Sequence, residues 1–235
     1  MTDPLKPATP ATDTPRLFIG IIALFLLAAL VPTLWSALDL QAAALFVGPQ
    51  AAIPAGGWWW VVWINAEIPT VFRYFLLIAF MGWVASLFME RWKSWRMGLA
   101  FVVVAGILGP GAVVNWGVKD NWQRARPYQV QAFGGTQTFS RATVMTDQCD
   151  ANCSFVSGHV ACGVFLASLG LVHRRRQRVW AAIGVASGLV IGFARMADVA
   201  HWLSDVLWAF PITLGTSWLV WRLMLLYRKP SATVG

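Results

Sequence analysis

Charged residues are scarce in this chain. Only 12% of its 235 residues are Asp, Glu, Lys or Arg, whereas 58% are hydrophobic and 15 are Trp. Soluble domains carry about 25% charged residues, so this composition excludes an ordinary soluble protein. The sequence therefore predicts an integral membrane protein.

Long hydrophobic runs occur six times. A helix needs about 20 apolar residues to cross a hydrocarbon core about 30 Å thick. We therefore predict an all-α integral membrane fold with six transmembrane helices. The first run lacks a signal-peptide cleavage site, which favours a retained anchor. The predicted spans are Leu17–Leu38, Thr70–Met89, Met97–Val118, Val156–Val172, Val179–Ala194 and Val206–Tyr227.

The predicted spans form one membrane domain over residues 16–229. Residues 1–15 are rich in Thr, Pro and Ala, which is typical of a disordered tail. Residues 230–235 form a second short tail. We expect both tails in the cytoplasm for the reason given next.

The net charge of +8 raises the possibility of nucleic-acid binding, but the distribution of basic residues argues against it. Twelve of the 18 Lys and Arg lie beside alternate ends of the predicted spans. The positive-inside rule places these segments and both termini in the cytoplasm. We expect the membrane to be a bacterial inner membrane, whose other face is periplasmic. They are Lys6, Arg16, Arg91, Lys93, Arg96, Arg174, Arg175, Arg176, Arg178, Arg222, Arg228 and Lys229.

The remaining six cations fall on the opposite, periplasmic side. Positive charge there runs against the topological bias, so a functional reason is expected for it. Three of the six belong to the clusters described below. The six are Arg73, Lys119, Arg124, Arg126, Arg141 and Arg195.

Residues 38–69 lie on the same predicted outer side and contain Trp58-Trp59-Trp60 and Trp63. Indole rings prefer the headgroup level, so we expect one or two interfacial helices here. A seventh, re-entrant span is the alternative, and an even number of crossings fits the charge pattern better. The tryptophans would either guide a lipid headgroup or anchor the protein.

Three short clusters hold the unusual chemistry of the chain. Together they supply three cations, two imidazoles and one carboxylate. Such a set suits a phosphate ester, which carries about −1.5 to −2 charge near neutral pH and several strong acceptor oxygens. The clusters are Lys119 with Arg126-Pro127, Ser157-Gly158-His159, and Arg195 with His201 and Asp205.

Spacing predicts local geometry in the first two clusters. Lys119 and Arg126 are seven residues apart, so on a continuous helix they would share a face about 10 Å apart, with Pro127 ending the helix. Ser157 stands where the outer loop meets the fourth span. Its hydroxyl and the free amides of the first helical turn could face one anion, and Gly158 allows close approach.

In the third cluster, His201 and Asp205 are four residues apart and should stack on one helix face, where the carboxylate orients the imidazole. Asp198 is a rival partner for His201 and could equally pair with Arg195. Arg195 would lie on another face of an unbroken helix, so we predict a tight turn between Arg195 and Val199, with the next helix beginning near Val199.

The three strings, in this order and spacing, closely resemble the motifs of the type-2 phosphatidic acid phosphatase family. These are membrane lipid phosphatases related in site architecture to vanadium haloperoxidases. The resemblance covers Lys119 to Asp205, and it implies the same helical core. The chain departs from the usual pattern at Val156, where the family commonly has Pro, and at Ala194, where it commonly has Ser.

The resemblance also implies roles. His201 would attack phosphorus and form a phosphohistidine, Asp205 would hold its other ring nitrogen, and His159 would protonate the leaving group. The family needs no metal or other cofactor, and three nearby cations would repel a metal ion. The phosphate would be held by Lys119, Arg126, Ser157, Gly158 and Arg195.

The loop between the first two motifs bears on the substrate. Its Phe133-Gly134-Gly135 and Asn152–His159 strings are similar to those of lipid A phosphatase-like members of the family, including 4′-phosphatases. Arg124 and Arg141 could recognise a second phosphate or a headgroup. Cys149 and Cys153 could form a disulfide on an oxidising side.

Several functions remain open at this point. Hydrolysis of a lipid A 1- or 4′-phosphate is the first expectation. Phosphatidylglycerophosphate, undecaprenyl diphosphate and phosphatidic acid are alternative substrates. A lipid phosphotransferase and a non-catalytic anionic-lipid binder are alternative classes, although the complete His and Asp set argues against an inert binder. The expected partners are the bilayer and its lipids, without nucleic acid.

Overall fold

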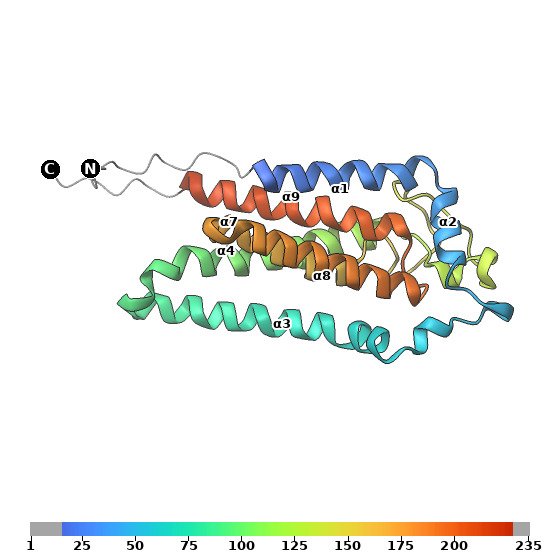
Figure 1. The fold of residues 1–235 in the computed structure, drawn as a ribbon, viewed down its shortest axis with the longest axis horizontal. Coiled ribbons are helices and arrows are strands. Elements are labelled where there is room, and N and C mark those ends of the chain that lie inside the picture. Colours follow the sequence, from blue (N-terminus) through green and yellow to red (C-terminus); the bar gives the residue numbers. More distant parts are fainter. Residues whose placement is uncertain (1–15, 228–235) are drawn as a thin grey trace.

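The computed structural model describes residues 16–227, which form a bundle of helices running side by side (Figure 1). No β-strand occurs within this range, so the predicted all-α fold is confirmed. The predicted tails, residues 1–15 and 230–235, lie outside the described residues.

Six helical columns run along the bundle. Five of them are long and apolar enough to cross a membrane, while the column Gly158–Val172 is shorter. Six crossings therefore stay a prediction. The columns are α1 (Arg16–Leu34), α3 (Trp59–Phe88), α4 (Arg96–Gly106) continued by the π-helical η4 (Ile107–Lys119), α6 (Gly158–Phe165) continued by η7 (Leu166–Ser168) and α7 (Leu169–Val172), α8 (Gln177–Ala197), and α9 (Leu203–Tyr227).

The short helix α6 packs against α3, α8, α9 and η4. Most of its apolar residues are buried, among them Val160, Val164 and Phe165. Neighbouring helices come close because they carry glycine at the contacts: a methyl group at Gly188 of α8 would lie 2.5 Å from Val164. This packing places the first residues of α6 at one end of the bundle.

The long connecting segments also lie at the end of the bundle that holds the first turn of α6. Helix α2 (Ala37–Ala44) crosses this end, at the right of Figure 1, and short 3₁₀ turns η1 (Pro49–Ala51) and η2 (Pro54–Gly57) follow it. Helix α3 begins at Trp59 rather than at Thr70. The predicted start of this helix is therefore wrong, because Pro69 is accommodated inside a continuous helix, while the interfacial location of residues 38–69 stays a prediction.

Two interruptions of helix shape the same end. The three-residue helix α5 (Asp120–Trp122) stops at Gln123, whose φ of 47° is left-handed. The prediction that Lys119 and Arg126 lie on one continuous helix is therefore wrong. Between α8 and α9 the chain makes a tight turn, as predicted, with Val199 at a φ of 51°. Helix α9 begins at Leu203, however, and not near Val199 as predicted.

The loop 123–156 folds back over these helix ends. Cys149 and Cys153 are bonded in the structure, with their Cα atoms 5.7 Å apart. The Ser154 amide donates to the Arg124 carbonyl at 2.9 Å, and the Trp202 indole donates to the Ala125 carbonyl at 2.9 Å. These bonds tie the loop to the turn that precedes α9. The loop also contains short 3₁₀ turns at Pro127–Gln129 and Gln131–Phe133.

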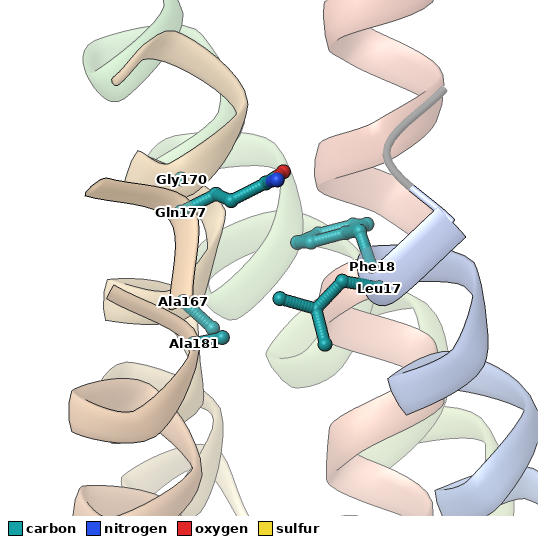
Figure 2. Close-up of a pocket in the computed structure, with 6 residues that line it drawn as sticks. All are labelled: Leu17, Phe18, Ala167, Gly170, Gln177 and Ala181. Atoms are coloured by element: carbon teal, nitrogen blue, oxygen red, sulfur yellow. The ribbon is translucent and has the colours of Figure 1, made fainter. Parts of the chain in front are cut away.

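The opposite end of the bundle has a small cavity between α1 and α8. Figure 2 shows the Gln177 side chain reaching across it toward Phe18. Its volume of about 10 Å³ is at the lower limit for one water molecule. Gln177 and Arg195 are separated by about 27 Å along α8, so this cavity is remote from the motif residues.

Candidate active site

The two cations of the first motif meet at one loop residue, Asn152. The Lys119 ammonium donates to Asn152 Oδ1 at 2.8 Å. The Arg126 guanidinium donates to the Asn152 carbonyl through Nε at 3.0 Å and Nη2 at 2.7 Å. Both side chains are buried. The structure thus brings the pair together although they do not share a helix.

Arg195 lies near the end of α8 and is also buried. Its Nη1 donates to Oδ1 of Asn65, on α3, and lies 3.5 Å from Asp198 Oδ2. Asn65 Nδ2 donates to the same Asp198 oxygen at 2.9 Å. Asp198 therefore pairs with Arg195 and not with His201. Burial raises the pKa of Asp198, with Arg195 opposing this effect.

His201 lies in the turn before α9, so the prediction that it shares a helix face with Asp205 is wrong. The two groups still meet, because Asp205 in the first turn of α9 reaches back. Its Oδ2 lies 3.6 Å from His201 Nδ1 and accepts hydrogen bonds from the Trp202 amide at 3.0 Å and Ser154 Oγ at 2.5 Å. The carboxylate is fixed by groups other than the imidazole.

The surroundings of the His201 ring favour its neutral form. The residue is only 1% exposed. Burial lowers the pKa of His201 well below its usual value, and nearby cations, first Arg195, lower it further. A neutral imidazole keeps a lone pair on one ring nitrogen, which a nucleophile requires.

Four buried polar atoms of the motif residues have no hydrogen-bond partner within residues 16–227. Folded proteins leave few such atoms unpaired, and those that remain call for an explanation such as a bound ion or a catalytic role. A hydroxyl and a guanidinium N–H are donors that an anion would satisfy. The atoms are Ser157 Oγ, Arg195 Nε, His201 Nδ1 and His201 Nε2.

The second motif occupies the start of α6. Ser157 precedes the helix in an extended conformation, and Gly158 begins it. An added Cβ at Gly158 would lie 3.0 Å from Asn115 Oδ1. His159 follows in the first turn, and its Nε2 lies 3.0 Å from the carbonyl oxygen of Asn65.

Arg124 is not a headgroup ligand. Its side chain has no exposed surface and lies between two buried carboxylates. Nη2 donates to Asp39 at 2.7 Å, Nη1 donates to Asp205 at 2.5 Å, and Nε donates to the Ser140 carbonyl at 2.9 Å. The prediction of a headgroup contact for Arg124 is corrected accordingly. Arg141 is exposed, and its role stays a prediction.

Sequence reasoning missed Asp39, Asn65 and Asn152. Asp39, on α2, is fully buried and accepts from Ser204 Oγ at 2.6 Å as well as from Arg124. Their polarity was the signal that could have identified them. A single acidic or amide side chain beside long apolar runs needs a hydrogen-bond partner and often marks a functional site. Which partner it finds depends on the tertiary contacts.

A metal centre was not expected here. Among the described residues, no three His, Cys, Asp or Glu side chains are grouped as a metal ion would require. The positive charge of the three motifs comes from Lys119, Arg126 and Arg195.

Two histidines, a carboxylate and three buried cations of the motifs lie at one end of an apolar helical bundle, a set that suits a protein acting on a phosphate group. Comparison with known proteins identifies which class. The PAP2 superfamily profile matches residues 96–229, more than half of the chain, so the chain belongs to this superfamily, and it is a lipid phosphatase.

Curated relatives agree with this assignment. The chain is 34% identical over 199 residues to the lipid A 4′-phosphatase of Francisella tularensis subsp. novicida, covering 82% of this chain and 87% of the relative. It is 37% identical over 118 residues to the lipid A 4′-phosphatase of Rhizobium leguminosarum, covering 50% and 49%. The Rhizobium etli relative of the same name is 36% identical over 118 residues, covering 50% and 44%. No solved structure matches the chain.

Proposed function

We propose that this protein removes a phosphate monoester from lipid A at the periplasmic face of the bacterial inner membrane, most directly the 4′-phosphate. The similarity over most of both chains to a protein named lipid A 4′-phosphatase carries the substrate assignment. The buried histidine, carboxylate and cations at one end of the bundle support the chemistry.

The first step is an in-line attack. The lone pair of His201 attacks phosphorus, the ester P–O bond breaks, and a phosphohistidine forms. Asp205, 3.6 Å from Nδ1, stabilises the positive charge that develops on the ring. His159 gives a proton to the departing sugar alkoxide, which leaves as an alcohol.

The second step returns the enzyme to its starting state. His159, now without that proton, accepts one from water as the water attacks phosphorus. The P–N bond breaks, inorganic phosphate leaves, and His201 regains its lone pair. Lys119, Arg126 and Arg195, with Ser157 and the Gly158 amide, hold the phosphoryl oxygens through both steps.

A cavity of about 250 Å³ is lined in part by residues that are close to the motifs in the sequence. It is lined by the segment after α2 and by Tyr128, Phe133 and Val199. Tyr128 follows Arg126-Pro127, and Val199 lies two residues before His201. Part of the headgroup would occupy this cavity while its phosphate enters the site.

Phosphate release by the purified protein tests the proposal. We expect release from lipid A to exceed release from phosphatidylglycerophosphate, undecaprenyl diphosphate and phosphatidic acid, with or without EDTA, because three cations supply the positive charge. Mass spectrometry of the product should show loss of one phosphate from lipid A. Preference for another lipid would contradict the substrate, EDTA inhibition would contradict the metal-independent step, and transfer to an acceptor alcohol would indicate a phosphotransferase.

Cysteine labelling tests the orientation. In a Cys162→Ala background, a membrane-impermeant maleimide added to spheroplasts should label Gln131→Cys, on the loop that carries the site. The reagent should not label Arg175→Cys, in the connection between the fourth and fifth columns, until the membrane is permeabilised. Both positions are exposed, so accessibility to the reagent differs only by side. Labelling of Arg175→Cys alone would invert the orientation.

A further inference from the structure

A proline inside helix α3 frees a carbonyl close to the site. In an α-helix each amide N–H donates to the carbonyl four residues earlier. Pro69 has no N–H, so it cannot donate to the carbonyl of Asn65. His159 Nε2 lies 3.0 Å from that oxygen. The helix thus supplies His159 with an acceptor that an unbroken helix would have used itself.

The side chain of Asn65 makes two more contacts with the site. Its Oδ1 accepts from Arg195 Nη1, and its Nδ2 donates to Asp198 Oδ2 at 2.9 Å. One residue of α3 therefore binds residues of α6, α8 and the turn after α8, which lie 94 to 133 positions away in the sequence.

The contact also decides which His159 nitrogen transfers protons. A carbonyl oxygen only accepts hydrogen bonds, so Nε2 must carry a hydrogen. The proton that His159 exchanges with the leaving group or water must then pass through Nδ1. For Arg195, Nη1 is held by Asn65 and Asp198, while Nε is buried without a partner within residues 16–227 and remains available to a phosphate oxygen.

We propose that Asn65 and Pro69 are positioning residues of the catalytic site. The Asn65 carbonyl, released by Pro69, orients His159 for proton transfer through Nδ1, and the Asn65 amide orients Arg195 for phosphate binding. Neither residue touches the substrate. The proposal rests on the phosphatase function proposed above and on the role given there to His159.

Two substitutions separate the two halves of the proposal. Pro69→Ala introduces an N–H that competes for the Asn65 carbonyl, so the orientation of His159 is lost while the helix is retained, because alanine favours helix. We expect kcat on lipid A to fall about 10- to 100-fold with KM nearly unchanged. Asn65→Ala keeps the carbonyl but removes both side-chain contacts, so KM should rise about 10-fold with a smaller change in kcat.

Pro32→Ala in α1 is the matched control, since it also replaces a proline inside a helix. It should leave kcat and KM within about twofold of wild type. The melting temperature of each variant in detergent separates positioning from folding. Folded Pro69→Ala protein with wild-type kcat would overturn the His159 half, and Asn65→Ala with wild-type KM would overturn the Arg195 half. Wild-type protein that releases no phosphate from any lipid would instead contradict the proposed function.

Discussion

His201→Ala protein is expected to release no measurable phosphate while remaining folded in detergent. The ring is nearly inaccessible, and neither nitrogen has a hydrogen-bond partner within residues 16–227, so the fold depends little on its polar contacts. Its loss removes the nucleophile, and removal of a catalytic nucleophile can lower kcat about 10⁶-fold. Phosphate release measured with the purified variant checks this.

The same experiment distinguishes the two catalytic histidines. His159→Ala should also lose turnover, but it retains the group that forms the covalent intermediate. Acid hydrolyses a phosphohistidine, so the protein should be quenched at alkaline pH after reaction with ³²P-labelled lipid, and protein-bound ³²P should then be measured. We expect slow labelling of His159→Ala and none of His201→Ala. Labelled His201→Ala protein would show that another residue is the nucleophile.

The third histidine of the chain serves as the control. His173 follows α7, at the end of the bundle opposite the site, where it contacts the rings of Trp95 and Trp180. His173→Ala should retain wild-type turnover. If His173→Ala lost activity as fully as His201→Ala, the inactivity of the histidine variants would reflect misfolding and not the loss of a catalytic group.

The second large effect is expected in stability. Arg124→Ala should destabilise the protein by about 3–5 kcal/mol, because it leaves two buried carboxylates, Asp39 and Asp205, without their shared cation. Arg124→Lys should recover only part of the loss, because an ammonium group cannot reproduce the planar, three-nitrogen geometry. Thermal unfolding in detergent measures both. Arg141→Ala, an exposed arginine of the same loop, should change stability by less than about 0.5 kcal/mol.

The stability of the Arg124→Ala variant should also depend on pH, which gives a second test of the role of Arg124. Burial already raises the pKa of Asp39, and Arg124 opposes that rise. Without Arg124 the folded protein should hold the Asp39 proton to higher pH than the unfolded chain does. Stability is then greatest below the unfolded pKa of about 3.9 and is lost as pH rises through the folded pKa. A variant that becomes less stable, relative to wild type, on mild acidification would contradict this account.

Several features of the fold could be predicted from local sequence. The apolar runs predicted the helices because a membrane requires every backbone polar group to be bonded within its segment. The turn near Val199 was predicted from the mismatch between the Arg195 to His201 spacing and the helical repeat. The start of α3 was misplaced, because a proline usually interrupts a helix, whereas α3 continues through Pro69.

The site shows a similar division. Motif order and spacing identified the residues that the structure brings to one end of the bundle, yet two geometric reasons offered for their convergence were wrong. Lys119 and Arg126 meet through Asn152 and not along one helix. Asp205 reaches His201 from the next helix and not from a shared face. The spacing within a motif identified which residues belong to the site. It did not predict the path of the backbone between them, because residues with a left-handed conformation, such as Gln123, interrupt the helix.

The sequence by itself determined that this protein is helical and apolar and carries the residues of a phosphatase, because composition and motif chemistry are local properties. Only the tertiary structure decided the partners of the buried polar groups. It paired Arg124 with Asp39 and Asp205, and Asn65 with Arg195, Asp198 and His159. These choices follow from which helix ends pack together, since a buried charge or amide must bond to whatever partner the packing brings within reach.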